Sequence, residues 1–286
     1  MLITILIVFK SYLNIIRYSK HNLFFIFYFI NHYIILIMNI LRFPKSLIMG
    51  KNNYIESGVK ILENVIIGNN NKIYDGTVIY PNTVIGNNNI ILNNNILGEV
   101  SIESGINIKT FEKKFNGLEI GNNNFFHISN KIFTGYISKT RIGNDNKFLA
   151  ESHIGHDTTI HNNVTTYPRV ITGGHSTLLD YSTMGMYSCI QQNSVLGSFS
   201  MIGMGNAVSH NVFPFYIYLD KKYLRFNKVK IPEELQIDTY SSELINLIEN
   251  LKKNNCDKDI VKQYDLPENI KYYIYKFLDI LKINKI

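Results

Sequence analysis

A strict period of six residues runs through this chain from residue 54, and it limits the possible folds more than any other feature. The stretch from 54 to 101 divides into eight hexads, YIESGV KILENV IIGNNN KIYDGT VIYPNT VIGNNN IILNNN ILGEVS. An α-helix repeats about every 3.6 residues and a β-strand about every 2, whereas a period of six is typical of parallel β-helices. The second residue of every hexad is aliphatic: Ile55, Ile61, Ile67, Ile73, Ile79, Ile85, Ile91 and Leu97.

The repeat has a simple physical meaning. Each hexad is expected to form a short strand and a turn, and three hexads complete one triangular coil. The motif IIGNNN at residue 66 returns as VIGNNN at residue 84, which is 18 residues or three hexads later. One aliphatic side chain per hexad points inward, while Gly and Asn occupy the turns because they adopt positive φ at low cost. Coils bury their cores only against one another, so several are needed for stability.

The period is interrupted once and then resumes. Residues 108–117, IKTFEKKFNG, are expected to leave the coil as an excursion loop, and LEIGNNN at 118–124 re-enters it. Among the later inward positions Thr166 and Thr172 are polar, so either the register slips there or Val164, Val170 and Ile171 fill the core instead. These later positions are Ile142, Phe148, Ile154, Ile160, Thr166, Thr172, Leu178, Met184, Ile190, Leu196, Ile202 and Val208.

The chain divides into three parts on this basis. Residues 1–49 form an apolar extension, residues 50–228 the β-helix, and residues 229–286 a small α-helical C-terminal domain. Ser241 is a candidate start for one C-terminal helix, and Pro267 fits the first turn of the last one.

The extension contains a segment, 22–41, of about 20 residues without a formal charge, which is long enough to span a membrane as a helix. Two alternatives stay open: a translation start assigned too early, with Met38 or Met49 as the true start, or a structured helix. The first nine residues, MLITILIVF, are too short to span a membrane, and no small-residue cleavage site follows them, so a signal peptide fits poorly.

The amino-acid composition limits the possible classes of binding partner only slightly. The chain has 29 basic and 22 acidic residues and a formal net charge of +7, which suits anionic partners. The basic residues form no stripe interleaved with aromatic residues, so nucleic acid is not an expected partner. Cys189 and Cys256 are the only cysteines, and they indicate no disulfide framework or cysteine metal site. A cytoplasmic location is expected, with membrane attachment through 22–41 as the alternative.

The stretch AESHIGHDTTIHNNV, which begins at residue 150, holds three of the eight histidines. His156 is followed directly by Asp157, and a histidine beside a carboxylate suits a general base near neutral pH. An alternative is a zinc site, because the spacing of His156 and His161 resembles that of γ-class carbonic anhydrases, with His127 as a third candidate ligand. The rest of that pattern does not match, and we expect no metal. His161 lies in a turn-like setting and is expected on the surface.

Several segments carry a resemblance to a known family, the bacterial UDP-N-acetylglucosamine O-acyltransferases, which begin lipid A synthesis. The resemblance implies a left-handed parallel β-helix, assembled as a homotrimer with active sites between subunits. It also implies transfer of a hydroxyacyl chain from acyl carrier protein to the 3-hydroxyl of the sugar nucleotide. The segments are LEIGNNN at 118, TRIGNDNKFLAESHIGHDTTIHNNV at 140, GGH at 173, MGMYSCIQQ at 184 and AVSHNVFPFY at 207.

The resemblance assigns roles to individual residues. His156 corresponds to the catalytic histidine of an H-x-x-H-D pattern, Asp157 supports it, and Gly174 offers a backbone N–H to the oxyanion. The resemblance and the basic character of the chain also suggest contacts to substrate, from His153, His175, Gln192, Lys109 and Arg225.

Three departures from the family concern the acceptor. Gln191 replaces a family histidine, although Gln192 is kept. The D-x-K segment reads IKT at 108–110, and FFHISNKIFTG replaces the family's R-E and H-R-G-T residues. The basic run at 221–230, with Lys221, Lys222 and Arg225, either meets an acidic carrier or phosphopantetheine phosphate or is a solvated loop.

The leading hypothesis is therefore acyl transfer from a thioester donor, acyl carrier protein, to a nucleotide sugar resembling UDP-N-acetylglucosamine. An acetyl-CoA-dependent sugar O- or N-acetyltransferase is the first alternative, and a non-catalytic trimeric scaffold is the second. No cofactor is expected beyond the thioester donor itself, as phosphopantetheine or acyl-CoA. The acceptor sugar and the acyl length stay open.

Overall fold

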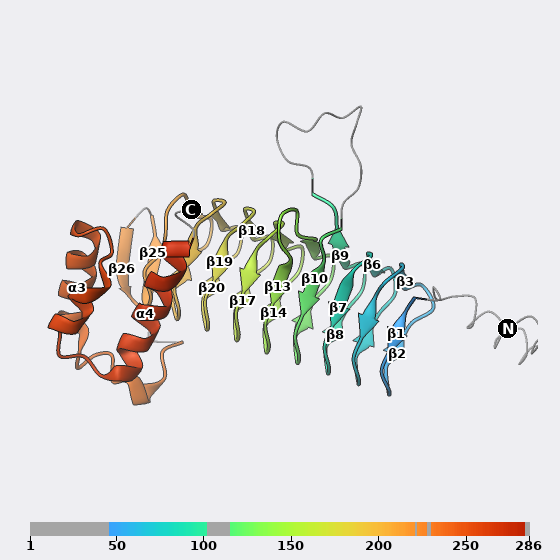
Figure 1. Ribbon diagram of the computed structural model, residues 1–286, viewed down its shortest axis with the longest axis horizontal. Coiled ribbons are helices and arrows are strands. Elements are labelled where there is room, and N and C mark those ends of the chain that lie inside the picture. The colour runs from blue at the N-terminus through green and yellow to red at the C-terminus, as the bar shows by residue number, and fades with distance from the viewer. Residues whose placement is uncertain (1–45, 102–114, 221, 228–229, 284–286) are drawn as a thin grey trace, which may run out of the picture. The chain divides into compact units, whose positions relative to one another are not determined.

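The computed structural model describes residues 46–101, 115–220, 222–227 and 230–283, and Ser46–Ile286 belongs to one compact unit (Figure 1). The segment 22–41, Lys109 and most of the excursion loop 108–117 lie outside the described residues. The side chain of Arg225 also lies outside them.

The described chain winds into three sheets whose strands recur every third element (Figure 1). The first sheet holds β1 (Ile48–Met49), β4 (Ile66–Ile67), β7 (Thr83–Ile85), β10 (Leu118–Ile120), β13 (Thr140–Ile142), β16 (Thr159–Ile160), β19 (Thr177–Leu178) and β22 (Val195–Leu196). The second holds β2 (Tyr54–Ile55), β5 (Lys72–Ile73), β8 (Ile90–Ile91), β11 (Phe125–Phe126), β14 (Lys147–Phe148), β17 (Thr165–Thr166), β20 (Thr183–Met184), β23 (Met201–Ile202), β25 (Tyr216–Leu219) and β26 (Lys222–Phe226). The third holds β3 (Lys60–Ile61), β6 (Val78–Ile79), β9 (Ile96–Glu99), β12 (Lys131–Phe133), β15 (His153–Ile154), β18 (Ile171–Thr172), β21 (Cys189–Ile190) and β24 (Ala207–Val208).

Every strand pair in the described ranges is parallel except β25 with β26, which is antiparallel. Successive coils pair in a constant register, for example Ile66 with Val84 and Ile67 with Ile85, except for a shift after Ile132 in the pair of β12 with β9. The parallel β-helix predicted from the six-residue period is thereby confirmed. The first strand of the repeat among the described residues is β1, which lies just ahead of the predicted boundary at 50.

The inward positions stay in register through the two polar hexads. Thr166 pairs with Phe148 and Thr172 with Ile154, and both threonines are buried. Val164 and Val170 are also buried, at a second inward position of the same coils, whereas Ile171 is 51% exposed. Of the two alternatives, the register slip is wrong, and core filling is confirmed for Val164 and Val170 but not for Ile171.

The asparagine runs form a ladder along one corner of the coil. The backbone N–H of Asn69 donates to Asn87 Oδ1 at 2.7 Å, and the same bond recurs in the following coils. The ladder ends at Asp180, which accepts from the N–H of Asn162 at 3.1 Å and forms an ion pair with Lys276. Its members are Asn69, Asn87, Asn122, Asn144 and Asn162.

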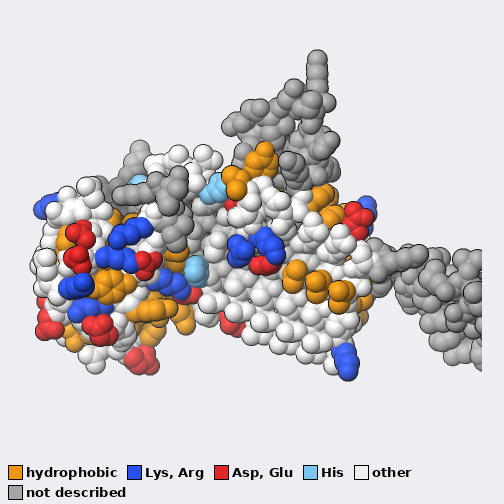
Figure 2. Space-filling model, viewed as in Figure 1, with side chains coloured by type: hydrophobic (Ala, Val, Ile, Leu, Met, Phe, Trp, Pro, Cys, Tyr) orange, Lys and Arg blue, Asp and Glu red, His pale blue; other side chains and the backbone are white. Residues whose placement is uncertain are grey.

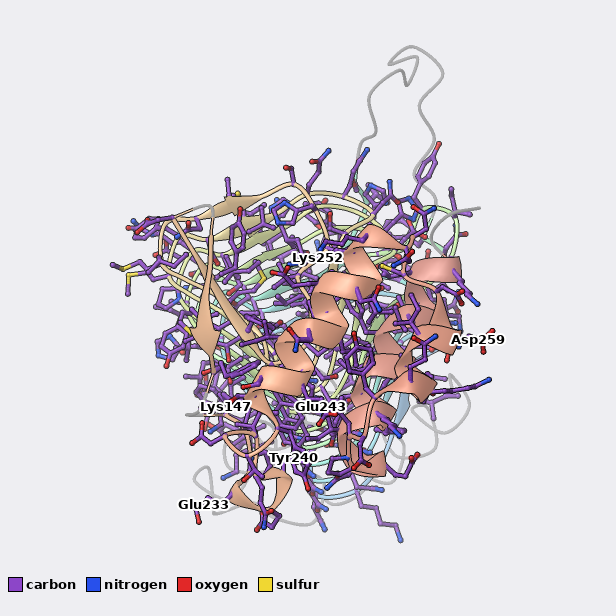
Figure 3. The ribbon with its side chains drawn as sticks, turned by 90° about the vertical axis from the view of Figure 1, so that its left-hand side faces the viewer. Lys147, Glu233, Tyr240, Glu243, Lys252 and Asp259 are labelled. Atoms are coloured by element: carbon purple, nitrogen blue, oxygen red, sulfur yellow. The ribbon has the colours of Figure 1, made fainter. Side chains whose placement is uncertain are left out.

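The C-terminal region packs against the last coils, as the view from that end shows (Figure 3). Pro267 directly precedes α4, and its carbonyl accepts from the N–H groups of Ile270 and Lys271. The ring of Phe199, on the coil, lies 4.8 Å from that of Tyr273 on α4. None of the helices in the described ranges is both long and apolar enough to cross a membrane. The elements are η2 (Glu233–Leu235), α3 (Ser241–Lys253), η3 (Lys258–Gln263) and α4 (Glu268–Ile283).

Truncating one inward ring is expected to destabilise the coil far more than truncating an outward one. Phe148 is fully buried and stacks on Phe126 with ring centroids 4.7 Å apart. Phe148→Ala should therefore cost about 3–5 kcal/mol in the free energy of unfolding, because it leaves a cavity in a close-packed core.

Phe125→Ala is the matched control, because Phe125 is only partly buried on the outer side of the neighbouring strand. Its cost should be less than half as large. Urea unfolding followed by circular dichroism measures both costs, since the chain has no tryptophan. Equal costs would contradict the assignment of inward and outward positions.

Candidate active site

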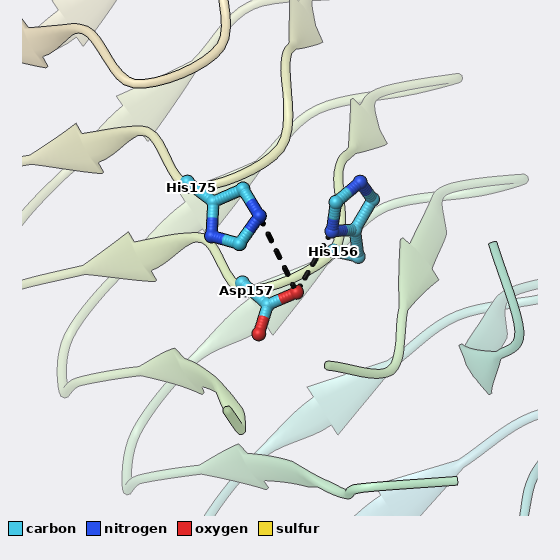
Figure 4. Close-up of side chains that lie close together, drawn as sticks. All are labelled: His156, Asp157 and His175. Carbon is cyan, nitrogen blue, oxygen red and sulfur yellow. Dashed lines mark hydrogen bonds and ion pairs between the residues drawn. The ribbon is translucent and has the colours of Figure 1, made fainter. Parts of the chain in front are cut away.

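Three titratable side chains meet at one corner of the β-helix (Figure 4). His156 and Asp157 lie in the turn between β15 and β16, and His175 lies in the turn between β18 and β19. His175 follows Asp157 by 18 residues, the length of one coil. The repeat therefore places His175 at the same corner, one coil further on. One ligand-type atom from each residue lies within 4.8 Å of the others.

Asp157 is buried, with a side chain only 1% exposed, and both of its oxygens accept hydrogen bonds. Oδ2 accepts from His156 Nδ1 at 2.8 Å and from the backbone N–H of Tyr136 at 2.8 Å. Oδ1 accepts from the N–H of Ile137 at 3.0 Å, and from both the N–H and the hydroxyl of Ser138. Five donors therefore surround this carboxylate. A carboxylate has about four lone pairs, so at least two of the donors share one lone pair.

The hydrogen bonds determine the charge of Asp157. Burial by itself raises the pKa of this carboxyl group, since desolvation disfavours its ionised form. The bonds from His156, Ser138 and Tyr136 stabilise the ionised form more strongly, and together they lower the pKa of Asp157 far below its usual range. The corner therefore holds a carboxylate anion across the whole neutral range.

The two histidines of the corner differ in how they face the carboxylate. His156 is 12% exposed and hydrogen-bonded to Asp157, whereas His175 is 31% exposed and its Nε2 lies 3.9 Å from Asp157 Oδ2. Their rings are nearly perpendicular, with centroids 5.0 Å apart. A Cβ on Gly174 would lie 2.6 Å from Nε2 and Cε1 of His156, so only glycine fits there without displacing the ring.

The other residues assigned from the sequence lie outside this hydrogen-bonded group. His153 is exposed on the outer side of β15, 4.9 Å from the Phe133 ring, and partial desolvation together with the charge of Lys131 lowers its pKa. Gln192 is exposed at the same corner, one coil after His175. Lys109 and the side chain of Arg225 lie outside the described residues.

The carbonic-anhydrase-like arrangement is not assembled within one chain. His161 and His127 are not part of the ligand-type cluster found among the described residues, which holds His156, Asp157 and His175. The donors on Asp157 also occupy the lone pairs that a divalent ion would need. His161 is only partly exposed, and burial and the charge of Lys276 lower its pKa although Asp180 acts in the opposite direction.

The segment that holds Asp157 was not predicted from the sequence. Tyr136, Ile137 and Ser138 lie between β12 and β13, in a stretch without the six-residue period. The sign of this contact in the sequence was the break in the six-residue period, which lies at the same corner and one coil before His156.

Comparisons with known proteins concern the repeat and the fold. Residues 47–81 match the family model for the bacterial transferase hexapeptide of six repeats. The structure of a UDP-N-acetylglucosamine acyltransferase from Bacteroides fragilis superposes with a TM-score of 0.67 at 24% identity, and covers 81% of this chain and 92% of that one. The fold and the repeats thus define the class of the chain: a hexapeptide-repeat, left-handed parallel β-helix.

Within this class, the curated relatives are acyl-[acyl-carrier-protein]–UDP-N-acetylglucosamine O-acyltransferases. The one from Sinorhizobium fredii is 38% identical over 76 residues, which is 27% of this chain and 28% of the relative. The one from Nautilia profundicola is 35% identical over 128 residues, 44% of this chain and 49% of the relative. The chain therefore spans less than half of the length of these relatives, and its predicted resemblance to them is confirmed.

Replacing Asp157 by asparagine should destabilise the fold in a pH-dependent way. The pKa of Asp157 is lowered in the folded chain, so its ionised form adds stability above the unfolded pKa, about 3.9, and that stability is lost as the pH falls below this value. Asp157→Asn should cost about 1.5–3 kcal/mol at pH 6, and clearly less at pH 3. Urea unfolding at the two pH values measures this difference.

Asp145→Asn is the control, since Asp145 is exposed and accepts from Asn123 Nδ2 at 3.1 Å. Its cost should be small at both pH values. A cost for Asp157→Asn that is the same at pH 6 and pH 3 would contradict a buried, ionised carboxylate.

Proposed function

We propose that the chain is an acyltransferase that moves an acyl group from a thioester donor to a hydroxyl of a nucleotide sugar, with His156 as the general base. The observation that carries this proposal is the 2.8 Å hydrogen bond between His156 Nδ1 and the buried carboxylate of Asp157. The names of the relatives support acyl transfer, an acyl-carrier-protein donor and an acceptor of the UDP-N-acetylglucosamine kind.

The bond to Asp157 determines which nitrogen of His156 takes up a proton. An ionised carboxylate only accepts hydrogen bonds, so Nδ1 donates and Nε2 carries the basic lone pair. A sugar hydroxyl attacks a thioester efficiently only when a base removes its proton as the new C–O bond forms. Nε2 takes that proton, Asp157 stabilises the imidazolium, and the proton passes to the thiolate when the C–S bond breaks.

Gly174 is well placed to supply a donor to the oxyanion formed during the attack. Its backbone lies against the Nε2 edge of His156, where a Cβ would approach to 2.6 Å. The N–H groups on either side are bonded, Gly173 to Ile190 O at 2.8 Å and His175 to His156 O at 2.9 Å. No acceptor within the described ranges takes the Gly174 N–H. A fixed N–H beside the base stabilises a developing negative charge.

The remaining roles concern substrate contacts. We propose that His175 and Gln192, on successive accessible corners, contact the acceptor, and that His153 lines the approach along the third sheet. Lys109 and Arg225 keep their predicted roles in binding the anionic parts of the substrates.

The donor presents its thioester on phosphopantetheine, carried either by acyl carrier protein or by coenzyme A, and no further cofactor is proposed. Basic and acidic side chains are mixed over α3 and α4, so this surface does not by itself select an acidic carrier protein (Figure 2). A homotrimer with sites between subunits and a cytoplasmic location complete the proposal, and membrane attachment through 22–41 stays a separate prediction.

A screen of donors and acceptors on the full chain tests the reaction. It offers acetyl-CoA and hydroxyacyl-carrier protein against UDP-N-acetylglucosamine and related amino-sugar nucleotides, and product mass is the readout. A long-chain ester is the expected product. An acetylated sugar would instead establish the acetyl-CoA-dependent alternative, and no product with any pair would favour a non-catalytic scaffold.

Removing the base tests the role of His156. His156→Ala should lower kcat/KM by about 10²–10⁴-fold while circular dichroism shows an intact fold, because a positioned base contributes that much. His127→Ala removes a partly buried imidazole from an earlier coil and should leave kcat/KM within about three-fold, a range set by what small surface changes usually do. If His156→Ala keeps most of its activity, another group is the base.

A further inference from the structure

Three consecutive backbone N–H groups and one hydroxyl converge on the carboxylate of Asp157, all from residues 136–138. We propose that this segment selects His156 rather than His175 as the partner of Asp157, and that Ser138 is a positioning residue acting through that carboxylate. This inference rests on the proposed function, since it explains how the proposed base is chosen.

The segment reaches Asp157 because its turn is longer than a regular one. The inward residues Ile132 and Ile142 are ten positions apart, whereas Ile154 and Ile160, at the same corner of the next coil, are six apart. The four extra residues fold over the corner that carries His156. Gly135 makes the tight bend possible, because a Cβ there would lie only 1.6 Å from Ser138 O.

Two histidines compete for one oxygen of Asp157. Oδ2 lies 2.8 Å from His156 Nδ1 and 3.9 Å from His175 Nε2, so a modest rotation of the carboxylate would exchange one partner for the other. Such a rotation would break the bonds that Oδ1 accepts from Ile137 and Ser138. Buried polar groups that lose their partners are costly, so the segment holds the carboxylate toward His156.

Ser138 contributes more to this orientation than its neighbours. It donates twice to Oδ1, from its N–H and from its hydroxyl, whereas Tyr136 and Ile137 each donate once. Within the described residues, the titratable groups that face His156 include Asp157, the His175 ring at 5.0 Å and the Tyr136 ring at 6.1 Å. Asp157 is the acidic one of these three, and only His156 faces it through Nδ1, so the orientation of the carboxylate decides whether His156 is held in the tautomer with a basic Nε2.

The direct test observes the imidazole N–H of His156 by NMR in the full chain labelled with [¹⁵N]histidine. The signal is assigned by its loss in His156→Gln. In Ser138→Ala the Nδ1 proton should move upfield and exchange with water about ten-fold faster, as expected when a charged hydrogen-bond network loses one donor. Ser138→Thr, which keeps the hydroxyl, should restore the wild-type signal.

Ser200→Ala is the control for loss of a serine hydroxyl hydrogen bond, because Ser200 Oγ donates to Gly197 O at 2.6 Å in a later coil. It removes a buried serine hydroxyl elsewhere and should leave the His156 signal unchanged. If Ser138→Ala does not fold, Ser138→Cys keeps the shape with a weak donor and should show the same shift in part. An unchanged His156 signal in a folded Ser138→Ala or Ser138→Cys variant would overturn the proposal.

Turnover gives the second readout and separates the two proposals. Ser138→Ala should lower kcat about ten-fold with KM within three-fold, since the lost bond orients the base and does not touch substrate. If Ser138→Ala changes the His156 signal but the wild-type chain turns over no donor, the proposed reaction is refuted. The proposal that residues 136–138 select His156 as the partner of Asp157 would still hold. Normal kcat in Ser138→Ala, with turnover in the wild type, would overturn the positioning role.

Discussion

The parallel register between coils is the constraint on which the rest of the structure depends. Because each strand pairs with the strand three elements later, residues at equal places in successive coils become neighbours, about 4.8 Å apart. Inward places favour apolar side chains, and the threonine pair in two adjacent hexads is accommodated by hydrogen bonds inside the coil. Thr166 Oγ1 lies 3.1 Å from Ser152 Oγ, and Thr172 Oγ1 accepts from the N–H of Gly155 at 3.0 Å.

The same register builds the corner that holds His156 from residues that are distant in the chain. Asp157 and His175 meet because they occupy the same place on successive coils, and Gly174 meets the ring of His156 for the same reason. A corner of a regular coil that nothing covers, however, offers its side chains to solvent and would not bury a carboxylate. The irregular turn before β13 supplies the cover and the donors that turn an exposed corner into an ordered, charged site.

The sequence predicted the periodic part of this arrangement well. The inward positions followed from spacing alone, because a hexad carries its strand and its turn together and needs no distant information. The adjacency of His156 and Asp157 was visible for the same reason. The contacts of residues 136–138 were not predictable, since a non-repeating turn has many possible paths and only the packed coil selects one.

Side chains at the margins of the repeat were also hard to predict from spacing. His161 was expected on the surface because it lies in a turn-like setting. It is partly buried instead, and burial together with the charge of Lys276 on α4 lowers its pKa. Ile171 occupies an outward place although it is aliphatic, since the register, and not the residue type, decides which face a side chain takes. Hydrophobicity alone is therefore a weaker guide than phase in such a fold.

The way the coil ends has a consequence for assembly. A stack of parallel coils offers an open edge to which another chain can add by strand pairing. Here β26 reverses direction on β25, and the asparagine ladder finishes at Asp180 with the ammonium of Lys276 across it. Neither feature can be continued by a further coil in the same register. The C-terminal region thus packs over the last coils and ends the regular parallel stacking of the second sheet.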